Sequence, residues 1–202
     1  MSLFLIRHGE TNSNRDKIIQ TPDTELSDLG HQQAYKLAQR FNMNDVEHIL
    51  CSDYLRTKQT ASPLIEALGC KISYSSLLRE RNFGDIRGLS YDEVGHDFHQ
   101  TDYRPVNGES IEQFSERTTQ AWHYICEQSL NAKGHILVIT HGLVLRELVK
   151  HQLDLTLHPN WRMAEYANTS IIEVDLKDLK TVYLLCDTEH LNNEEINQGG
   201  VV

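Results

Sequence analysis

The chain of 202 residues is poor in several features that would mark other classes of protein. It has only four cysteines, at positions 51, 70, 126 and 186, and no Cys-x-x-Cys pair. Cysteines in or beside apolar stretches behave as small hydrophobic residues, so we interpret these as reduced and structural, which predicts a cytoplasmic protein. No apolar run is long enough to cross a bilayer. Arg7 interrupts the first apolar run, so we expect no signal peptide.

Positive charge is also scarce. Lysine and arginine total 19 against 29 aspartates and glutamates, a formal net charge of −10. Such a surface repels nucleic acid and anionic membranes, so we expect neither as a partner. The length and a hydrophobic content of 39% suit one domain. We expect this domain over residues 1–186, with a lid at about 87–109 and a loosely ordered polar tail at 187–202.

Two apolar runs end in the same way. Residues 3–6 are followed by Arg7-His8-Gly9, and residues 136–139 are followed by Thr140-His141-Gly142. Short apolar runs of this kind are typical of buried strands, and ligands of open α/β sheets bind just beyond the carboxyl ends of strands. An arginine fork fits a phosphate, and a neutral imidazole beside it can act as a nucleophile.

Between and after these runs, helical and strand patterns alternate, which predicts an α/β fold. Ser27 is expected to cap a helix that ends near residues 42–44, and Ser52 or Asp53 a second helix that stops at Gly69. Ser110 and Gln113 form a capping box for a third. A fourth helix should follow His141. The expected further strands are residues 49–51, 71–74, 170–176 and 182–185, the last near a sheet edge.

Two charged residues between the His-Gly units can be read in two ways. Arg56 falls in the first turn of the second predicted helix, where it is either a solvated surface residue or a partner for a phosphate. Glu80 lies in a charged, glycine-containing stretch over residues 78–88, which we interpret as a loop crossing a site. The simplest alternative interpretation of Glu80 is a surface ion pair that contributes little to stability.

Taken in order, these segments resemble the histidine phosphatase superfamily, the phosphoglycerate-mutase-like proteins, and in particular its phosphatase branch. The resemblance rests on Arg7-His8-Gly9-Glu10-Thr11, on Arg56 within residues 52–61, on Glu80 within residues 78–84, and on Thr140-His141-Gly142. It covers most of residues 3–150. It implies a three-layer α/β/α fold with a mostly parallel central sheet and a small lid insertion.

The resemblance also implies roles for individual residues. His8 would be the nucleophile that becomes phosphorylated, Glu80 the general acid and base, and His141 a further catalytic residue. The implied phosphate-binding residues are Arg7, Asn14, Arg56, His141 and Gly142. Phosphoryl transfer depends chiefly on positioning and positive charge, which suits this set.

The activity expected from this set is a metal-independent phosphatase that hydrolyses a small phosphorylated metabolite without a cofactor. His96 and His99 lack a metal-site signature. The alternatives are a cofactor-dependent phosphoglycerate mutase and a non-catalytic phospho-ligand-binding protein. Mutases of the family generally carry longer insertions before the late His-Gly. The chain also has Thr21 where the family often has a glycine. The substrate and the oligomeric state are left open.

Overall fold

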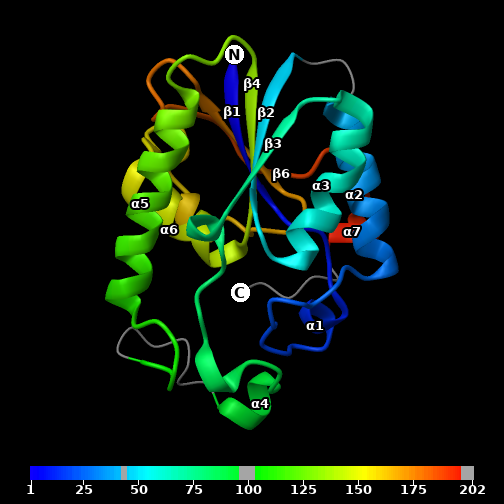
Figure 1. Cartoon of the computed structure of the whole chain (residues 1–202), viewed down its shortest axis with the longest axis vertical. Helices are drawn as coiled ribbons and strands as arrows, with labels where there is room; N and C mark the ends of the chain where they lie inside the picture. The colour runs from blue at the N-terminus through cyan, green and yellow to red at the C-terminus, as the bar shows by residue number, and fades with distance from the viewer. Residues whose placement is uncertain (42–44, 96–102, 197–202) are drawn as a thin grey trace.

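A six-stranded sheet forms the centre of the computed structural model, which describes residues 1–41, 45–95 and 103–196 (Figure 1). The strand order is β3-β2-β4-β1-β5-β6. The first four strands in this order run parallel, and β5 is antiparallel to both of its neighbours. The predicted mostly parallel sheet is therefore confirmed. The strands are β1 (Ser2–Arg7), β2 (Val46–Ser52), β3 (Lys71–Ser75), β4 (His135–Thr140), β5 (Ile171–Asp175) and β6 (Val182–Asp187).

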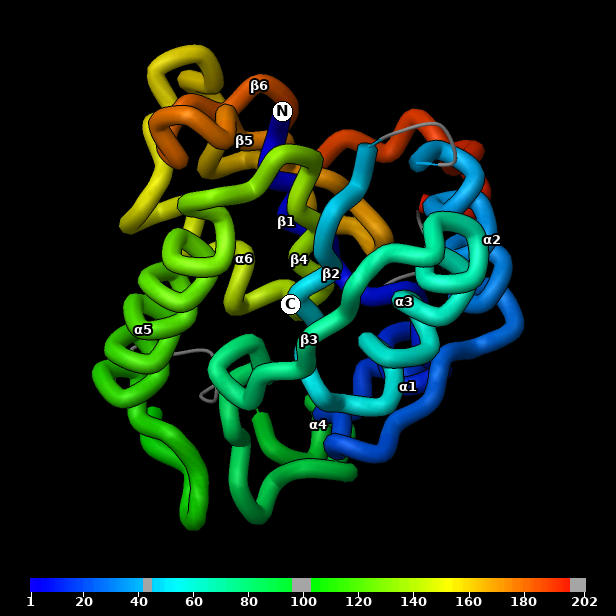
Figure 2. Tube along the Cα trace, turned by 45° about the horizontal axis from the view of Figure 1, so that its top comes forward, coloured from blue at the N-terminus to red at the C-terminus, as the bar shows by residue number. Residues whose placement is uncertain are grey.

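Helices cover both faces of the sheet, as Figures 1 and 2 show from two directions. Leu3 and Leu5 of β1 pack in the cluster that includes α5 (Ile111–Ser129) and α6 (Gly142–Gln152). Phe4 and Ile6, which point to the opposite face, pack in the cluster with α2 (Asp28–Phe41) and α3 (Leu55–Leu68). The central strands are buried on both faces for this reason. The predicted three-layer α/β/α architecture is confirmed.

Most helix ends lie where the sequence predicts them. The Ser27 hydroxyl accepts from the Gly30 amide at 3.0 Å at the start of α2. Ser110 and Gln113 form the predicted capping box of α5. Gly69 ends α3 in the left-handed conformation, with φ of 59°.

The predicted cap of α3 is wrong. Its N-cap is Tyr54, without a side-chain cap bond, because the two candidate residues are engaged elsewhere. Ser52 is the last residue of β2, and its hydroxyl contacts the His141 ring. Both Asp53 carboxylate oxygens accept from Arg79.

The two His-Gly units leave adjacent parallel strands at the same edge of the sheet. Arg7 is in register with Thr140, and the His8 amide donates to the Thr140 carbonyl at 3.0 Å. The chain leaves β1 toward α2 on one face and leaves β4 into α6 on the other, which opens a crevice between the strand ends. The fold thereby brings the residues after β1 and β4 together.

The C-terminal segment is better ordered than predicted. From the last residue of β6, residues 187–196 run back along α2 and include the short helix α7 (Asn193–Ile196). Arg40 pairs with Asp187, and Lys36 pairs with Glu195 at 2.6 Å. The expectation of a loosely ordered tail is wrong for these residues, because acidic side chains of the tail meet basic ones of α2. Residues 197–202 lie outside the described part.

The described part of the segment predicted as a lid lies beyond the carboxyl ends of the parallel strands, in the region of α4 (Tyr91–Val94) and α1 (Asn12–Arg15) (Figure 1). It is joined to residues 18–19: the Gly88 amide donates to the Ile19 carbonyl at 2.7 Å, and the Ile19 amide donates to the Leu89 carbonyl at 2.9 Å. The predicted loop over residues 78–88 begins at the last residue of the 3-10 turn η1 (Ser76–Leu78) and contains the 3-10 turn η2 (Gly84–Ile86).

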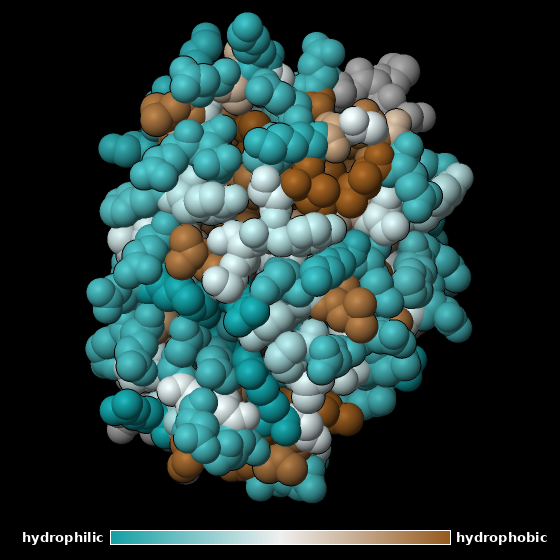
Figure 3. All heavy atoms as spheres, viewed as in Figure 1, coloured by the Kyte–Doolittle hydropathy of each residue, from teal (hydrophilic) through white to brown (hydrophobic). Residues whose placement is uncertain are grey.

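The surface fits the acidic, polar composition. The face in Figure 3 is mostly hydrophilic, with small and separate apolar patches. Across the described ranges 1–41, 45–95 and 103–196, no helix combines the length and apolar character needed to cross a membrane.

Gly30 is a position where the packing of α2 can be tested. A Cβ there would lie 2.0 Å from the Glu10 carbonyl oxygen, and backbone cannot yield as a side chain can. Gly30→Ala should lower the free energy of unfolding by about 1–3 kcal/mol through overpacking. Gln32→Ala, at an exposed position of the same helix, should change it by less than about 0.5 kcal/mol. Urea unfolding measures both, and equal values for the two variants would contradict the packing argument.

Candidate active site

A small cavity of about 30 Å³, here called the inner cavity, brings four of the predicted site residues together. Its lining includes Arg7, His8, Arg56 and Glu80. Arg7 and His8 come from the end of β1, Arg56 from the first turn of α3, and Glu80 from the loop after η1. Residues far apart in sequence therefore share one site.

The hydrogen bonds of His8 define its tautomer. Its Nδ1 lies 2.7 Å from the Gly9 carbonyl oxygen. A carbonyl can only accept, so Nδ1 carries the proton and Nε2 carries the lone pair. Arg56 Nε donates to this Nε2 at 3.3 Å. The imidazole thus presents the unprotonated nitrogen that the sequence-based mechanism requires.

His141 lies beside His8, with ring centroids 5.2 Å apart. Its Nε2 is 2.9 Å from the Ser52 hydroxyl, and its ring makes a T-shaped contact with the Tyr54 ring at 5.4 Å between centroids. Nδ1 of His141 has no hydrogen-bond partner among the described residues. His141 is fully buried and is not part of the lining of the inner cavity.

Two fully buried guanidinium groups flank the imidazoles. Arg7 Nη1 donates to the Tyr166 carbonyl, and Arg56 Nη1 donates to the Thr21 carbonyl at 2.9 Å. Burial lowers the pKa of each arginine to about 10. The nearby Glu80 has the opposite, smaller effect and raises the pKa of both arginines. Both therefore stay charged at neutral pH. The reading of Arg56 as a solvated surface residue is excluded by its 1% exposure.

The histidine pKa values shift in the same sense. Burial lowers the pKa of His8 and of His141 well below the usual 6.5, and the charge of Arg56 adds to the effect in both cases. Both rings are therefore neutral at pH 7.

Glu80 contacts the start of α6. Its Oε1 accepts from the Arg81 amide at 2.9 Å, and its Oε2 accepts from the Leu143 amide at 3.2 Å. Enclosure raises the pKa of Glu80, although the two amides, Arg56 and Arg7 all favour the charged form. The simple alternative of a surface ion pair is wrong, because Arg79 pairs with Asp53 instead.

The last two predicted phosphate-binding residues, Gly142 and Asn14, lie close to Arg7 and His8. Gly142 begins α6 against the Arg7 guanidinium, where an added Cβ would be 3.5 Å from Nε. Asn14 is linked to the backbone of His8 through Asn168, whose Nδ2 donates to the His8 carbonyl at 3.0 Å and to Asn14 Oδ1 at 3.4 Å. Asn14 is not part of the lining of the inner cavity.

Four residues of the site escaped the sequence analysis: Ser52, Tyr54, Arg87 and Asn168. Ser52 ends β2 and Tyr54 follows it, at the same edge of the sheet as His8, so the strand-end argument applied to β2 would have indicated them. The contacts of Arg87 and Asn168 come from loops, and no local pattern signals them.

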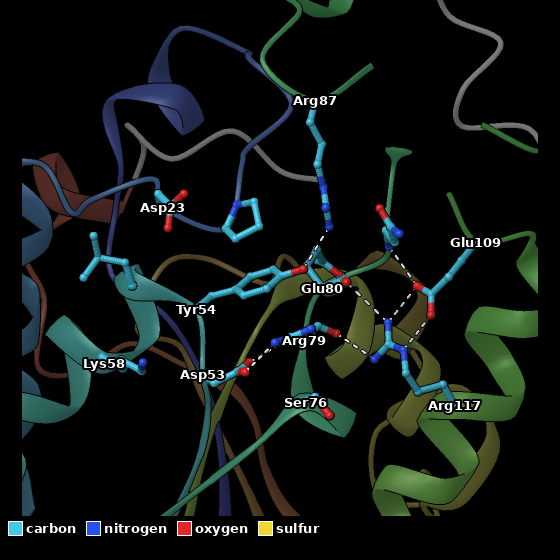
Figure 4. A pocket seen from close by; sticks show the side chains of 13 residues that line it. Asp23, Asp53, Tyr54, Lys58, Ser76, Arg79, Glu80, Arg87, Glu109 and Arg117 are labelled. Carbon is cyan, nitrogen blue, oxygen red and sulfur yellow. Dashed lines mark hydrogen bonds and ion pairs between the residues drawn. The ribbon is translucent and has the colours of Figure 1, made fainter. Parts of the chain in front are cut away.

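A larger hollow opens beside the inner cavity (Figure 4). This outer hollow has a volume of about 610 Å³, and Tyr54, Glu80 and Arg87 line both spaces. Two bidentate ion pairs stand in its wall, Arg79 with Asp53 and Arg117 with Glu109. It has room for a group attached to whatever the inner cavity holds.

Two buried arginines and the neutral imidazole of His8 line one small cavity, and the neutral imidazole of His141 lies beside His8. This arrangement suits a tetrahedral oxyanion. The site therefore belongs to the class that handles phosphoryl groups. Within residues 1–41, 45–95 and 103–196, no group of three or more histidine, cysteine, aspartate or glutamate side chains could hold a metal ion. His96 and His99 lie outside the described residues.

Comparison with known proteins gives the family. The model of the histidine phosphatase superfamily, branch 1, matches residues 3–188. The chain is 30% identical to a probable phosphatase of Schizosaccharomyces pombe over 96% of this chain and 97% of that protein. It is 34% identical to the probable phosphoglycerate mutase GpmB of Salmonella arizonae over 88% and 86%. The solved structure of Bacillus stearothermophilus YhfR superposes with a TM-score of 0.78 at 26% identity, over 95% and 99%.

The chain belongs to the histidine phosphatase superfamily, as its motifs predict. Its relatives carry the names of phosphatases and of mutases, so the supported activity is phosphoryl transfer.

The lowered histidine pKa values predict a specific pH dependence of stability. Below about pH 6.5 the unfolded chain binds a proton at His8 and the folded protein does not, so stability falls as the pH drops. His8→Asn should reduce this slope by up to about 1.4 kcal/mol per pH unit between about pH 6.5 and 5. Urea unfolding across this range measures the slope. Parallel curves for wild type and variant would contradict a neutral buried His8.

Proposed function

We propose that the protein is a metal-independent phosphatase that hydrolyses a small phosphomonoester through a phosphohistidine on His8. The observation that carries the proposal is the hydrogen bond from His8 Nδ1 to the Gly9 carbonyl, which leaves Nε2 unprotonated beside Arg7, Arg56 and Glu80. The family membership and the names of its relatives support phosphoryl transfer in general.

In the first step, His8 Nε2 attacks phosphorus, the N–P bond forms and the ester O–P bond breaks. Arg7, Arg56 and His141 bind the phosphoryl oxygens, and fixed positive charge stabilises the transition state in a site with little water. Arg56 Nε, now 3.3 Å from His8 Nε2, turns its hydrogen bond to a phosphoryl oxygen. Gly142 lets the start of α6 approach the same oxygens, and Asn14 supports them through its link to the His8 backbone.

Glu80 moves the protons. Its raised pKa favours the protonated form, which gives its proton to the leaving alcohol. The resulting carboxylate then takes a proton from the water that attacks phosphohistidine, and inorganic phosphate leaves as the N–P bond breaks. Every bond that forms is matched by one that breaks, and no metal or cofactor takes part.

Removal of the nucleophile tests the mechanism directly. His8→Ala should lower turnover of a phosphate ester by more than about a thousandfold, because no other group accepts the phosphoryl. Acid-labile, base-stable phosphate trapped on the wild-type protein should be absent from this variant. His123→Ala, at an exposed position of α5, is the control. EDTA should leave wild-type turnover unchanged. Near-normal turnover by His8→Ala would end the proposal.

A phosphoglycerate mutase is the second candidate, because the GpmB relative has that name at 34% identity. Product analysis with 3-phosphoglycerate distinguishes the two. We expect free phosphate and glycerate, because water can reach phosphohistidine from the outer hollow. Formation of 2-phosphoglycerate in the presence of a bisphosphate primer would assign the mutase activity instead.

A further inference from the structure

Arg87 stands at the boundary of the two spaces of the site. It lines both the inner cavity and the outer hollow. Its backbone is held where the lid joins residues 18–19, through the neighbouring bond from the Gly88 amide to the Ile19 carbonyl. From there its side chain extends down between Tyr54 and Glu80 (Figure 4). A group that extends from the inner cavity into the outer hollow must pass this guanidinium.

The hydrogen bonding of Arg87 is incomplete. Its Nη2 donates to the Tyr54 hydroxyl at 2.8 Å, a neutral acceptor. Its Nε is buried and has no partner among the described residues. Within the same part of the chain, no carboxylate lies within ion-pair distance of it, whereas Arg79 and Arg117 each have one. Arg87 is thus a cation in the substrate path whose charge is not matched by an ion pair.

The phosphoryl group itself does not need this third arginine. Arg7 and Arg56 already supply two positive charges to the inner cavity, which suffice for a phosphoryl dianion. The inner cavity, at about 30 Å³, has room for no more than a few waters. A bound ester must therefore displace side chains at its mouth, where Tyr54 and Arg87 meet.

We propose that Arg87 determines specificity by binding a second anionic group, carried by the leaving alcohol a few bonds from the ester oxygen. On binding, the guanidinium exchanges the Tyr54 hydroxyl for carboxylate or phosphate oxygens, a stronger and bidentate partner. The inference rests on the proposed function. The substrate class is a phosphomonoester of a short hydroxy acid, or one that carries a second phosphate.

Matched ester pairs test the inference. The ester 3-phosphoglycerate differs from glycerol 3-phosphate only by a carboxylate in place of a hydroxymethyl group. Fructose 1,6-bisphosphate and fructose 6-phosphate make the pair for a second phosphate. In one of the two pairs, the wild type should hydrolyse the ester with the additional anionic group with a kcat/KM about 10- to 100-fold higher than that of its partner. This factor corresponds to the free energy of a hydrogen bond to a charged group. The pair that shows the preference identifies the anion.

Three variants locate the source of this preference. Arg87→Gln should reduce the ratio to near one. Tyr54→Phe, which removes the competing hydroxyl, should retain the ratio. Arg79→Gln, a variant in the ion-paired wall of the outer hollow, should also leave the ratio unchanged. A ratio that survives Arg87→Gln, or a wild type without preference for either anionic ester, would overturn the inference.

A binding measurement separates this inference from the mechanism. Calorimetry on His8→Ala protein compares the affinities of the same ester pairs without turnover. The same ratio, again lost on Arg87→Gln, would support the role of Arg87 even if no phosphohistidine forms. Turnover through phosphohistidine without any preference would support the proposed function and refute the role of Arg87.

Discussion

The hydrogen bond between His8 Nδ1 and the Gly9 carbonyl is the interaction on which the site depends. It directs the proton of the ring away from the inner cavity and leaves the lone pair of Nε2 beside Arg56. The acceptor belongs to the next residue, so the tautomer follows from the backbone path after β1. Gly9 itself lies where α2 packs, since a Cβ there would be 2.7 Å from the Gly30 carbonyl oxygen. The packing of α2 and the position of the His8 proton are therefore connected through Gly9 and Gly30.

Burial gives this local arrangement its chemical effect. The same enclosure lowers the pKa values of Arg7, Arg56, His8 and His141 and raises that of Glu80. The arginines stay charged, the imidazoles stay neutral, and the carboxyl moves toward its protonated form. An incoming dianion meets two cations in a region of low dielectric constant, where each contact is stronger than in water. These are the states that the proposed acid, nucleophile and anion-binding roles require.

The errors about the cap of α3 and about the C-terminal tail have one cause. Ser52 and Asp53 have the right chemistry for a helix cap, and residues 187–196 have the composition of a mobile tail. In the folded protein each meets a partner from a distant segment: Ser52 meets His141, Asp53 meets Arg79, and the tail meets basic residues of α2. Local propensity is a weak guide when a long-range partner competes for the same polar group.

The sequence by itself determined the α/β class, the two strand–His–Gly units and the motifs that match the family, because these depend on patterns within short segments; the three layers were implied by the resemblance. Continuous apolar runs and helical stripes are properties of neighbours along the chain. The grouping of Arg7, Arg56, His141 and Glu80 could be inferred only by resemblance. Tertiary structure alone decided the tautomer of His8, the ion pairs of the outer hollow and the position of Arg87 between two cavities. These features depend on the distances between segments that lie far apart in the sequence. They also depend on the exclusion of water from between these segments in the folded protein.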